Sequence, residues 1–161
     1  MKPETITKQI FKIIPALLLV ALSAFLLQGD VWTFWTWYLL ALVLGAAAMP
    51  LTGRLFRRFQ DRGWMFSKVT AIAVSGFLTW FLVAVKIIKF TTGTCIVVTL
   101  VCAAASLILY CREQKAGFEC IPFVHLDLVY AEELLFFAAF LLWTYFAGFH
   151  PAAYGTEKFM D

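Results

Sequence analysis

The residues best suited to chemistry lie near the end of the chain, where an apolar segment with two carboxylates leads into a polar tail. Glu132 and Glu133 are adjacent in the apolar segment, and Glu157, Lys158 and Asp161 lie in the tail. On a helix, the four-residue spacing of the two tail acids puts both carboxylates on one face. Two acids beside a lysine can hold a metal ion, act as a general base, or bind a lipid phosphate through the lysine. A solvated connector is the simpler interpretation of the same residues.

The two adjacent glutamates need a special environment, because their segment is long and apolar enough to span a bilayer. A carboxylate at that depth is costly in lipid, so it is expected to face other helices or water and to pair with a cation. Adjacent helix positions point about 100° apart, so Glu132 and Glu133 are expected in different environments. We expect one to pair inward, with Lys68 as the candidate partner, and the other to reach the headgroup layer. The pattern is consistent with a structural ion pair or with a proton or ion pathway.

The composition is that of a membrane protein. Hydrophobic residues make up 63% of the 161 residues and charged residues only 14%, whereas about a quarter of the residues in soluble domains are charged. The mean hydropathy is +0.86. Because the polar links are too short to form a soluble domain, we predict a single transmembrane domain over residues 1–161, with a polar tail at 150–161.

The apolar stretches predict an all-α fold, a polytopic membrane bundle of five transmembrane helices. The predicted spans cover approximately residues 13–27, 33–51, 64–85, 94–110 and 128–149. The first is interpreted as an uncleaved helix rather than a signal peptide, because residues 28–30 offer no small-residue cleavage site. The aromatic residues from Trp32 to Tyr38 are interpreted as a belt at the headgroup level. Gly45 and the three alanines after it predict the close approach of a neighbouring helix.

The basic residues predict how these spans are oriented. With a cytoplasmic N-terminus and five spans, only Lys86, Lys89 and Lys158 fall on the outer side. The inner side receives ten of the 13 basic residues, which are Lys2, Lys8, Lys12, Arg54, Arg57, Arg58, Arg62, Lys68, Arg112 and Lys115. Since cytoplasmic links carry an excess of Lys and Arg, this bias predicts a cytoplasmic N-terminus and an extracytoplasmic tail. Lys68 is expected to snorkel to the cytoplasmic face, and an anion site among the arginines is an alternative use of this link.

Other classes of site are not supported. The basic residues lie in short segments beside apolar runs rather than on one phosphate-binding face, so no nucleic-acid partner is predicted. The cysteines form no C-x-x-C pair and are expected to be free thiols. Cys111, Cys120 and His125 lack a recognised zinc spacing, so no metal is assigned to them.

Several motifs occur in an order and spacing that resemble one membrane protein family. They are Arg54–Trp64 with Phe66–Lys68, Phe90–Thr94, Ala131–Phe136 and His150–Asp161. Over residues 38–161 the chain resembles the N-terminal part of the bacterial and archaeal YYY membrane proteins, which are large multi-pass relatives of the GT-C glycosyltransferases. The most specific element is the final Gly-Thr-Glu-Lys-x-Met-Asp.

The resemblance implies a role for the tail. In GT-C enzymes a transmembrane helix leads into an extracytoplasmic loop whose essential acid activates an acceptor for attack on a sugar held by a polyprenyl phosphate. By similarity, residues 128–149 would be that helix, and Asp161 or Glu157 the general base or the ligand of a divalent metal. Lys158 would face the lipid phosphate. The family continues with further helices, so we expect these residues to be the N-terminal part of such an enzyme and to be inactive alone.

The sequence is therefore consistent with three functions, all of them in the cell membrane with the lipid bilayer as partner. The first is the N-terminal part of a glycosyltransferase, with a polyprenyl-phosphate sugar and further membrane helices of the same or another chain as partners. The alternative is a non-catalytic multi-pass scaffold or partner subunit whose acidic tail contacts another chain. The third is a small transporter that uses Glu132 or Glu133.

Overall fold

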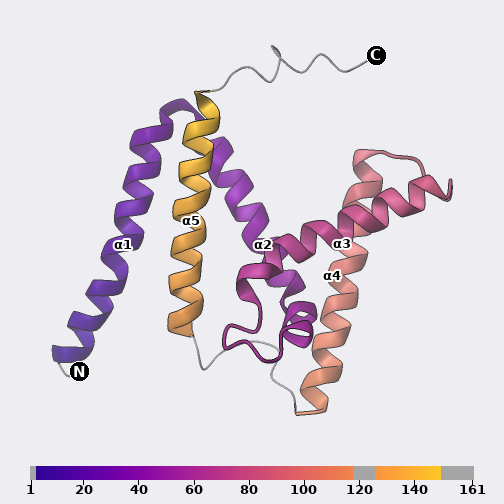
Figure 1. Ribbon diagram of the computed structural model, residues 1–161, viewed down its shortest axis with the longest axis horizontal. Coiled ribbons are helices and arrows are strands. Elements are labelled where there is room, and N and C mark those ends of the chain that lie inside the picture. Colours follow the sequence, from indigo (N-terminus) through magenta and orange to yellow (C-terminus); the bar gives the residue numbers. More distant parts are fainter. Residues whose placement is uncertain (1–2, 118–125, 150–161) are drawn as a thin grey trace. The chain divides into compact units, whose positions relative to one another are not determined.

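The computed structural model describes residues 3–117 and 126–149, and every regular element in those ranges is helical. No strand occurs in them, so the predicted all-α fold is confirmed for this part of the chain. The elements, drawn in Figure 1, are α1 (Pro3–Leu27), η1 (Gln28–Asp30), α2 (Val31–Leu55), α3 (Trp64–Ala84), α4 (Thr92–Lys115) and α5 (Leu126–Gly148).

Three stretches of the described residues are long and apolar enough to cross a membrane: Ile13–Leu55, Trp64–Ala84 and Thr92–Lys115. The first has 43 residues, which as a helix would measure about 65 Å, or about twice a 30 Å hydrocarbon core. It contains α1 and α2, and the chain reverses between them at η1, where Gln28 has a φ of 41° (Figure 1). The stretch therefore has the length and the turn for two crossings, while the full count of five spans stays a prediction.

The structure divides into two compact units. Of the described residues, unit 1 comprises 3–38 and 133–149, and unit 2 comprises 39–117 and 126–132. In unit 1, α1, the start of α2 and most of α5 share an aromatic core, in which the Phe137 ring lies edge-on to Phe34 and to Tyr38, with centroids 5.4 and 4.8 Å away. The buried core residues are Phe34, Tyr38, Phe137 and Leu141, and Leu19, Leu26, Leu27, Trp35, Phe136 and Phe140 pack against them.

The interpretation of residues 32–38 as an aromatic belt is wrong for Phe34 and Tyr38. These two residues are four positions apart, so they lie on the same face of α2, and that face packs against α5. Trp32 and Trp37, on other faces of the helix, are 83% and 60% exposed. The composition of the segment predicted its aromatic character but not which rings turn inward.

In unit 2, α2 approaches α3 closely at Gly45. A Cβ atom at this position would lie 2.8 Å from Lys68 Cγ and 2.9 Å from Ser67 Oγ. The close approach predicted for this run of small residues is therefore confirmed. Ser67 and Thr52 are fully buried, and each hydroxyl bonds a carbonyl of its own helix, at 2.7 Å to Trp64 and 3.1 Å to Met49. Small side chains that satisfy themselves in this way let membrane helices pack tightly.

The link between α2 and α3 is a compact turn rather than an open loop. Backbone N–H groups of Phe59 and Arg62 bond the carbonyls of Phe56 and Phe59, at 3.0 and 3.2 Å. Arg62 and Gly63 both adopt positive φ, at 53° and 77°. A Cβ at Gly63 would lie only 2.6 Å from the Phe56 ring, so both the backbone and the space require glycine there.

The contact at Gly45 predicts an asymmetry between two helical glycines. Gly45→Ala is expected to destabilise the protein by about 1–3 kcal/mol, because the new methyl group overlaps the stem of Lys68 and the side chain of Ser67. At Gly76 an added Cβ would meet no neighbouring atom within 4 Å. Gly76→Ala is therefore expected to be neutral or to stabilise the protein by up to about 1 kcal/mol. Equilibrium unfolding in detergent micelles measures both, and equal effects would contradict the packing described.

Candidate functional site

Of the predicted site residues, the structure describes Glu132 and Glu133. Glu157, Lys158 and Asp161 lie outside the described residues, and their roles stay predictions. Cys120 and His125 also lie outside them. Cys95, Cys102 and Cys111 are free thiols, as predicted. The candidate site is therefore described from the two glutamates near the start of α5 and their contacts.

Glu133 belongs to unit 1 and is held by an aromatic hydroxyl. The Tyr38 hydroxyl donates a hydrogen bond to Glu133 Oε1 over 2.7 Å. Tyr38 is buried in the aromatic core, with its ring stacked parallel to that of Phe34. The hydrogen bond therefore ties the start of α5 to α2 in a mostly apolar setting. One of the two glutamates was expected at the headgroup layer, and the sequence pattern did not predict Tyr38 as a partner.

Glu132 belongs to unit 2 and interacts with two charged residues. The Asp61 carboxyl group, from the link after α2, repels the Glu132 charge and approaches it as a hydrogen-bonding partner, while Lys68 of α3 attracts it. One oxygen of Glu132, Oε2, is buried and has no hydrogen-bond partner. The candidate Lys68 thus lies near one glutamate, and Asp61 is an additional acid that sequence reasoning missed.

Lys68 does not snorkel, contrary to expectation. Its side chain is only 3% exposed, and its Nζ lies 5.0 Å from the centre of the Trp64 ring. The stem runs along Gly45, where the missing side chain leaves room for it. The Glu132 charge and the Trp64 ring replace part of the hydration that the Lys68 ammonium group loses on burial.

The charges of this cluster constrain what it can do. If Asp61 and Glu132 are both ionised, the cluster with Lys68 carries a net charge of −1 in a largely buried place. A proton on one carboxyl group or a further cation neutralises it, so the cluster is chemically able to hold a proton or to act as a structural ion pair. Within residues 13–117 and 126–149 no three His, Cys, Asp or Glu side chains are grouped to hold a metal ion.

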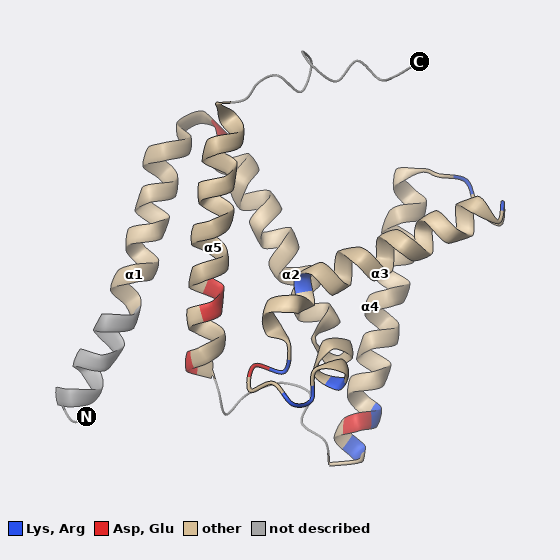
Figure 2. Cartoon of the chain, in the orientation of Figure 1, with Lys and Arg blue, Asp and Glu red and all other residues tan. Residues whose placement is uncertain are grey.

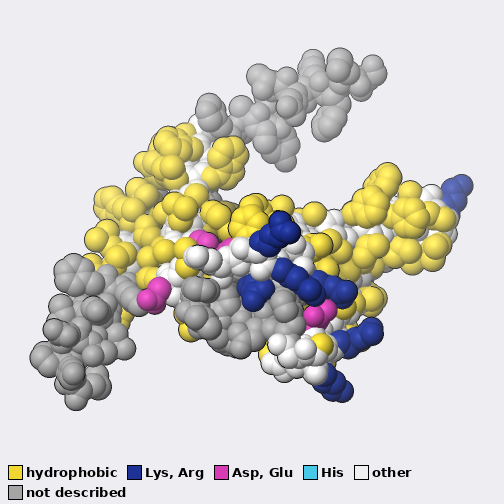
Figure 3. Space-filling model, turned by 60° about the horizontal axis from the view of Figure 1, so that its bottom comes forward, with side chains coloured by type: hydrophobic (Ala, Val, Ile, Leu, Met, Phe, Trp, Pro, Cys, Tyr) yellow, Lys and Arg dark blue, Asp and Glu magenta, His cyan; other side chains and the backbone are white. Residues whose placement is uncertain are grey.

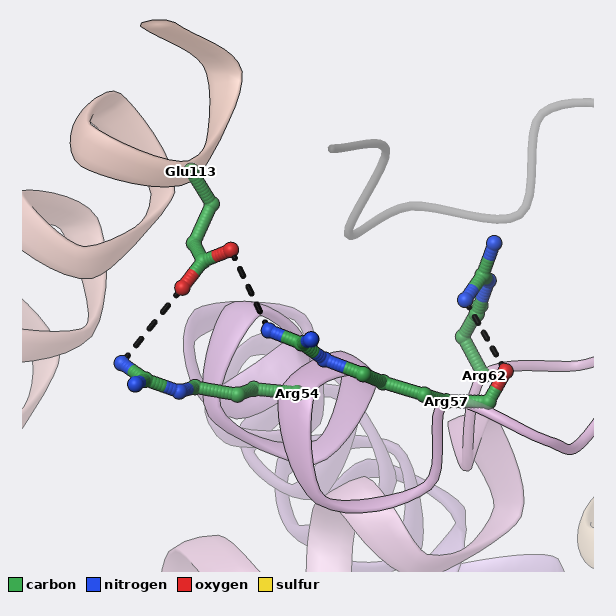
Figure 4. Close-up of polar contacts among 4 residues, drawn as sticks. All are labelled: Arg54, Arg57, Arg62 and Glu113. Atoms are coloured by element: carbon green, nitrogen blue, oxygen red, sulfur yellow. Dashed lines mark hydrogen bonds and ion pairs between the residues drawn. The ribbon is translucent and has the colours of Figure 1, made fainter. Parts of the chain in front are cut away.

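A second polar cluster ties the end of α2 to the end of α4. Arg54 Nη1 and Arg57 Nη2 each lie 3.4 Å from a different oxygen of Glu113, and Arg62 Nη1 donates to the Arg57 carbonyl over 3.0 Å (Figure 4). Most charged residues in Figure 2 lie near helix ends or in links, and the middle of α4 has none. Charges placed in this way are typical of helices whose middles lie in lipid.

The long apolar helices and the charges at their ends define an integral membrane protein of the all-helical class. Residues 74–161, more than half of the chain, match the family described as uncharacterized membrane protein (DUF2298). The chain therefore belongs to this family, which confirms its membrane character. No curated protein and no solved structure matches it.

The hydrogen bond to Glu133 predicts that Tyr38→Phe destabilises the protein by about 0.5–2 kcal/mol, in the range measured for polar contacts between membrane helices. The substitution keeps the ring in the aromatic core and removes only the donor. Tyr145→Phe is the matched control, because the Tyr145 ring contacts Phe149 and no bond of its hydroxyl is found in the described chain. Equilibrium unfolding that shows equal losses in the two variants would contradict the assigned bond.

The buried cluster predicts a larger effect for Lys68→Met. Removing the cation leaves Asp61 and Glu132 to repel each other, which is expected to destabilise the protein by about 3–5 kcal/mol. Adding Glu132→Gln should recover part of that loss, since only one carboxyl group then remains. Lys89→Met, at an exposed lysine, is expected to stay within about 0.5 kcal/mol of the parent. The idea fails if thermal unfolding shows no rescue in the double variant.

Proposed function

We propose that the chain is the N-terminal part of a GT-C-like glycosyltransferase that uses a sugar carried on polyprenyl phosphate. The supporting observation is that the family match runs from residue 74 to residue 161, so it takes in α5 and the whole acidic segment after it. In the resemblance to the YYY membrane proteins, that pair of elements is the helix and loop that bring an essential acid to the sugar donor. Catalysis requires further helices from the same or another chain.

The proposal needs five crossings, a cytoplasmic N-terminus and an extracytoplasmic acidic segment. Two ion pairs support part of this topology, since Arg54 at the end of α2 and Arg57 just after it contact Glu113 near the end of α4. The two helix ends therefore lie at the same end of unit 2, as expected if α3 and α4 cross the membrane and return. α5 has 23 residues, or about 35 Å of helix, enough to carry the chain back across.

In this proposal the residues of α5 and of the tail have separate roles. Glu132 and Glu133 hold the start of α5 through Lys68 and Tyr38. Asp161 or Glu157 removes a proton from the acceptor hydroxyl or holds a divalent metal, and Lys158 contacts the lipid phosphate.

The alternative is a non-catalytic membrane scaffold or partner subunit. It is favoured by the fact that Glu132 and Glu133 already make internal contacts, so stability alone explains their positions. It is also consistent with large exposed apolar side chains on α5, such as Trp143 at 74%. These are suited to contact further helices as well as lipid.

The test compares Asp161→Asn with the parent in the protein as expressed from its natural gene. Membranes are supplied with a polyprenyl-phosphate-linked sugar, and transfer is measured. Loss of the general base is expected to lower the rate by about 10²–10⁴-fold, and Glu157→Gln identifies whether the second acid shares the role. Asp30→Asn is the control, because Asp30 is an exposed acid that the proposed topology puts on the same side. If Asp161→Asn transfers sugar at the parent rate, the catalytic assignment is wrong.

A further inference from the structure

The arginines at the end of α2 are held outward in a fixed arrangement. Arg54 and Arg57 have side chains that are 52% and 50% exposed, yet each is anchored by a different oxygen of Glu113. The carboxylate that anchors them is only 15% exposed. A guanidinium has five N–H donors in a rigid plane, more than an ion pair through one nitrogen uses. Arg54, which pairs with Glu113 through one nitrogen, therefore keeps N–H donors that can face a further anion.

This surface carries an excess of positive charge. Arg58 is exposed in the same link, and Arg112 and Lys115 are exposed in the last turn of α4. Asp61, the acid within the arginine-rich link, is buried and interacts with Glu132, so it offsets these charges little at the surface. Dark blue side chains accordingly gather in one area of Figure 3.

Exposed apolar side chains occur in the same segment as the arginines and indicate what kind of anion fits. Leu55 is 64% exposed and Phe59 is 53% exposed, and both lie within the arginine-rich segment. Figure 3 shows hydrophobic side chains next to some of the blue ones. A soluble phosphate makes no favourable contact with exposed apolar side chains. A lipid presents its phosphate and its acyl chains together, so it can contact both kinds of residue.

We propose that Arg54, Arg57 and Arg58 bind the phosphate of an anionic membrane phospholipid, with Leu55 and Phe59 against its acyl chains. Glu113 sets the positions of two of the guanidinium groups without neutralising all three. The lipid holds the α2–α3 link and the end of α4 at the membrane surface. This site is separate from the sugar chemistry proposed above and does not depend on it.

The test measures binding of phosphatidylglycerol to the purified protein in detergent, by native mass spectrometry and by the rise in unfolding temperature. The combined Arg54→Gln, Arg57→Gln and Arg58→Gln variant is expected to bind at least about tenfold more weakly, because each cation near a headgroup contributes to affinity. A Lys86→Gln, Lys89→Gln variant removes two exposed lysines at the other end of α3 and is expected to bind like the parent. Phosphatidylcholine should give no comparable stabilisation.

Two further measurements test the lipid site. Arg58→Gln alone removes an exposed side chain for which no hydrogen bond or ion pair is found within the described residues, so it reports on the lipid even if the triple variant fails to fold. Glycerol phosphate and inorganic phosphate test whether the headgroup anion alone is sufficient. The proposal is overturned if Arg58→Gln and the triple variant bind phosphatidylglycerol like the parent, if the lysine control loses as much, or if the free anions bind as well as the lipid.

Discussion

The positive charge of a lysine buried among apolar helices has to be compensated, and this requirement organises unit 2. An ammonium group removed from water loses its hydration, and only nearby negative charge and polarisable groups replace it. Lys68 has Trp64 within one turn of its own helix, and it acts on Glu132 of α5. Asp61 joins the same group from the link before α3. One charge therefore draws together the link, α3 and the start of α5, which are separated in the sequence.

Small residues make this balance sterically feasible. The stem of Lys68 runs where Gly45 has no side chain, and Ser67 beside it is fully buried. A larger residue at position 45 would separate α2 from α3, and the lysine would then be free to reach solvent. Packing and electrostatics therefore depend on each other here. The close approach of α2 and α3 excludes water from Lys68, and the buried lysine then requires a carboxylate partner.

The helices could be predicted from the sequence because long apolar runs leave the backbone few alternatives in lipid. Which side chains turn inward could not. Phe34 and Tyr38 have the composition of a headgroup belt, and only the packing of α5 against their shared face makes them core. Lys68 has the position of a snorkelling residue, yet it is buried over the Trp64 ring and attracts Glu132, which is far along the chain. Such choices depend on partners distant in sequence, which spacing along one segment does not reveal.

The same contacts bear on the transporter hypothesis for Glu132 and Glu133. A path for protons or ions needs successive polar groups through the apolar region, and the predicted spans carry no other acid and only one base, Lys68. Glu133 is bonded to a tyrosine inside an aromatic core, and Glu132 lies near a lysine and a second acid. Both glutamates therefore lie where helices meet, and their contacts are those expected of a structural role. Stable placement of α5 by these two contacts is also what a reactive acid beyond its far end would require, since catalytic groups work only when the element that carries them is held in register.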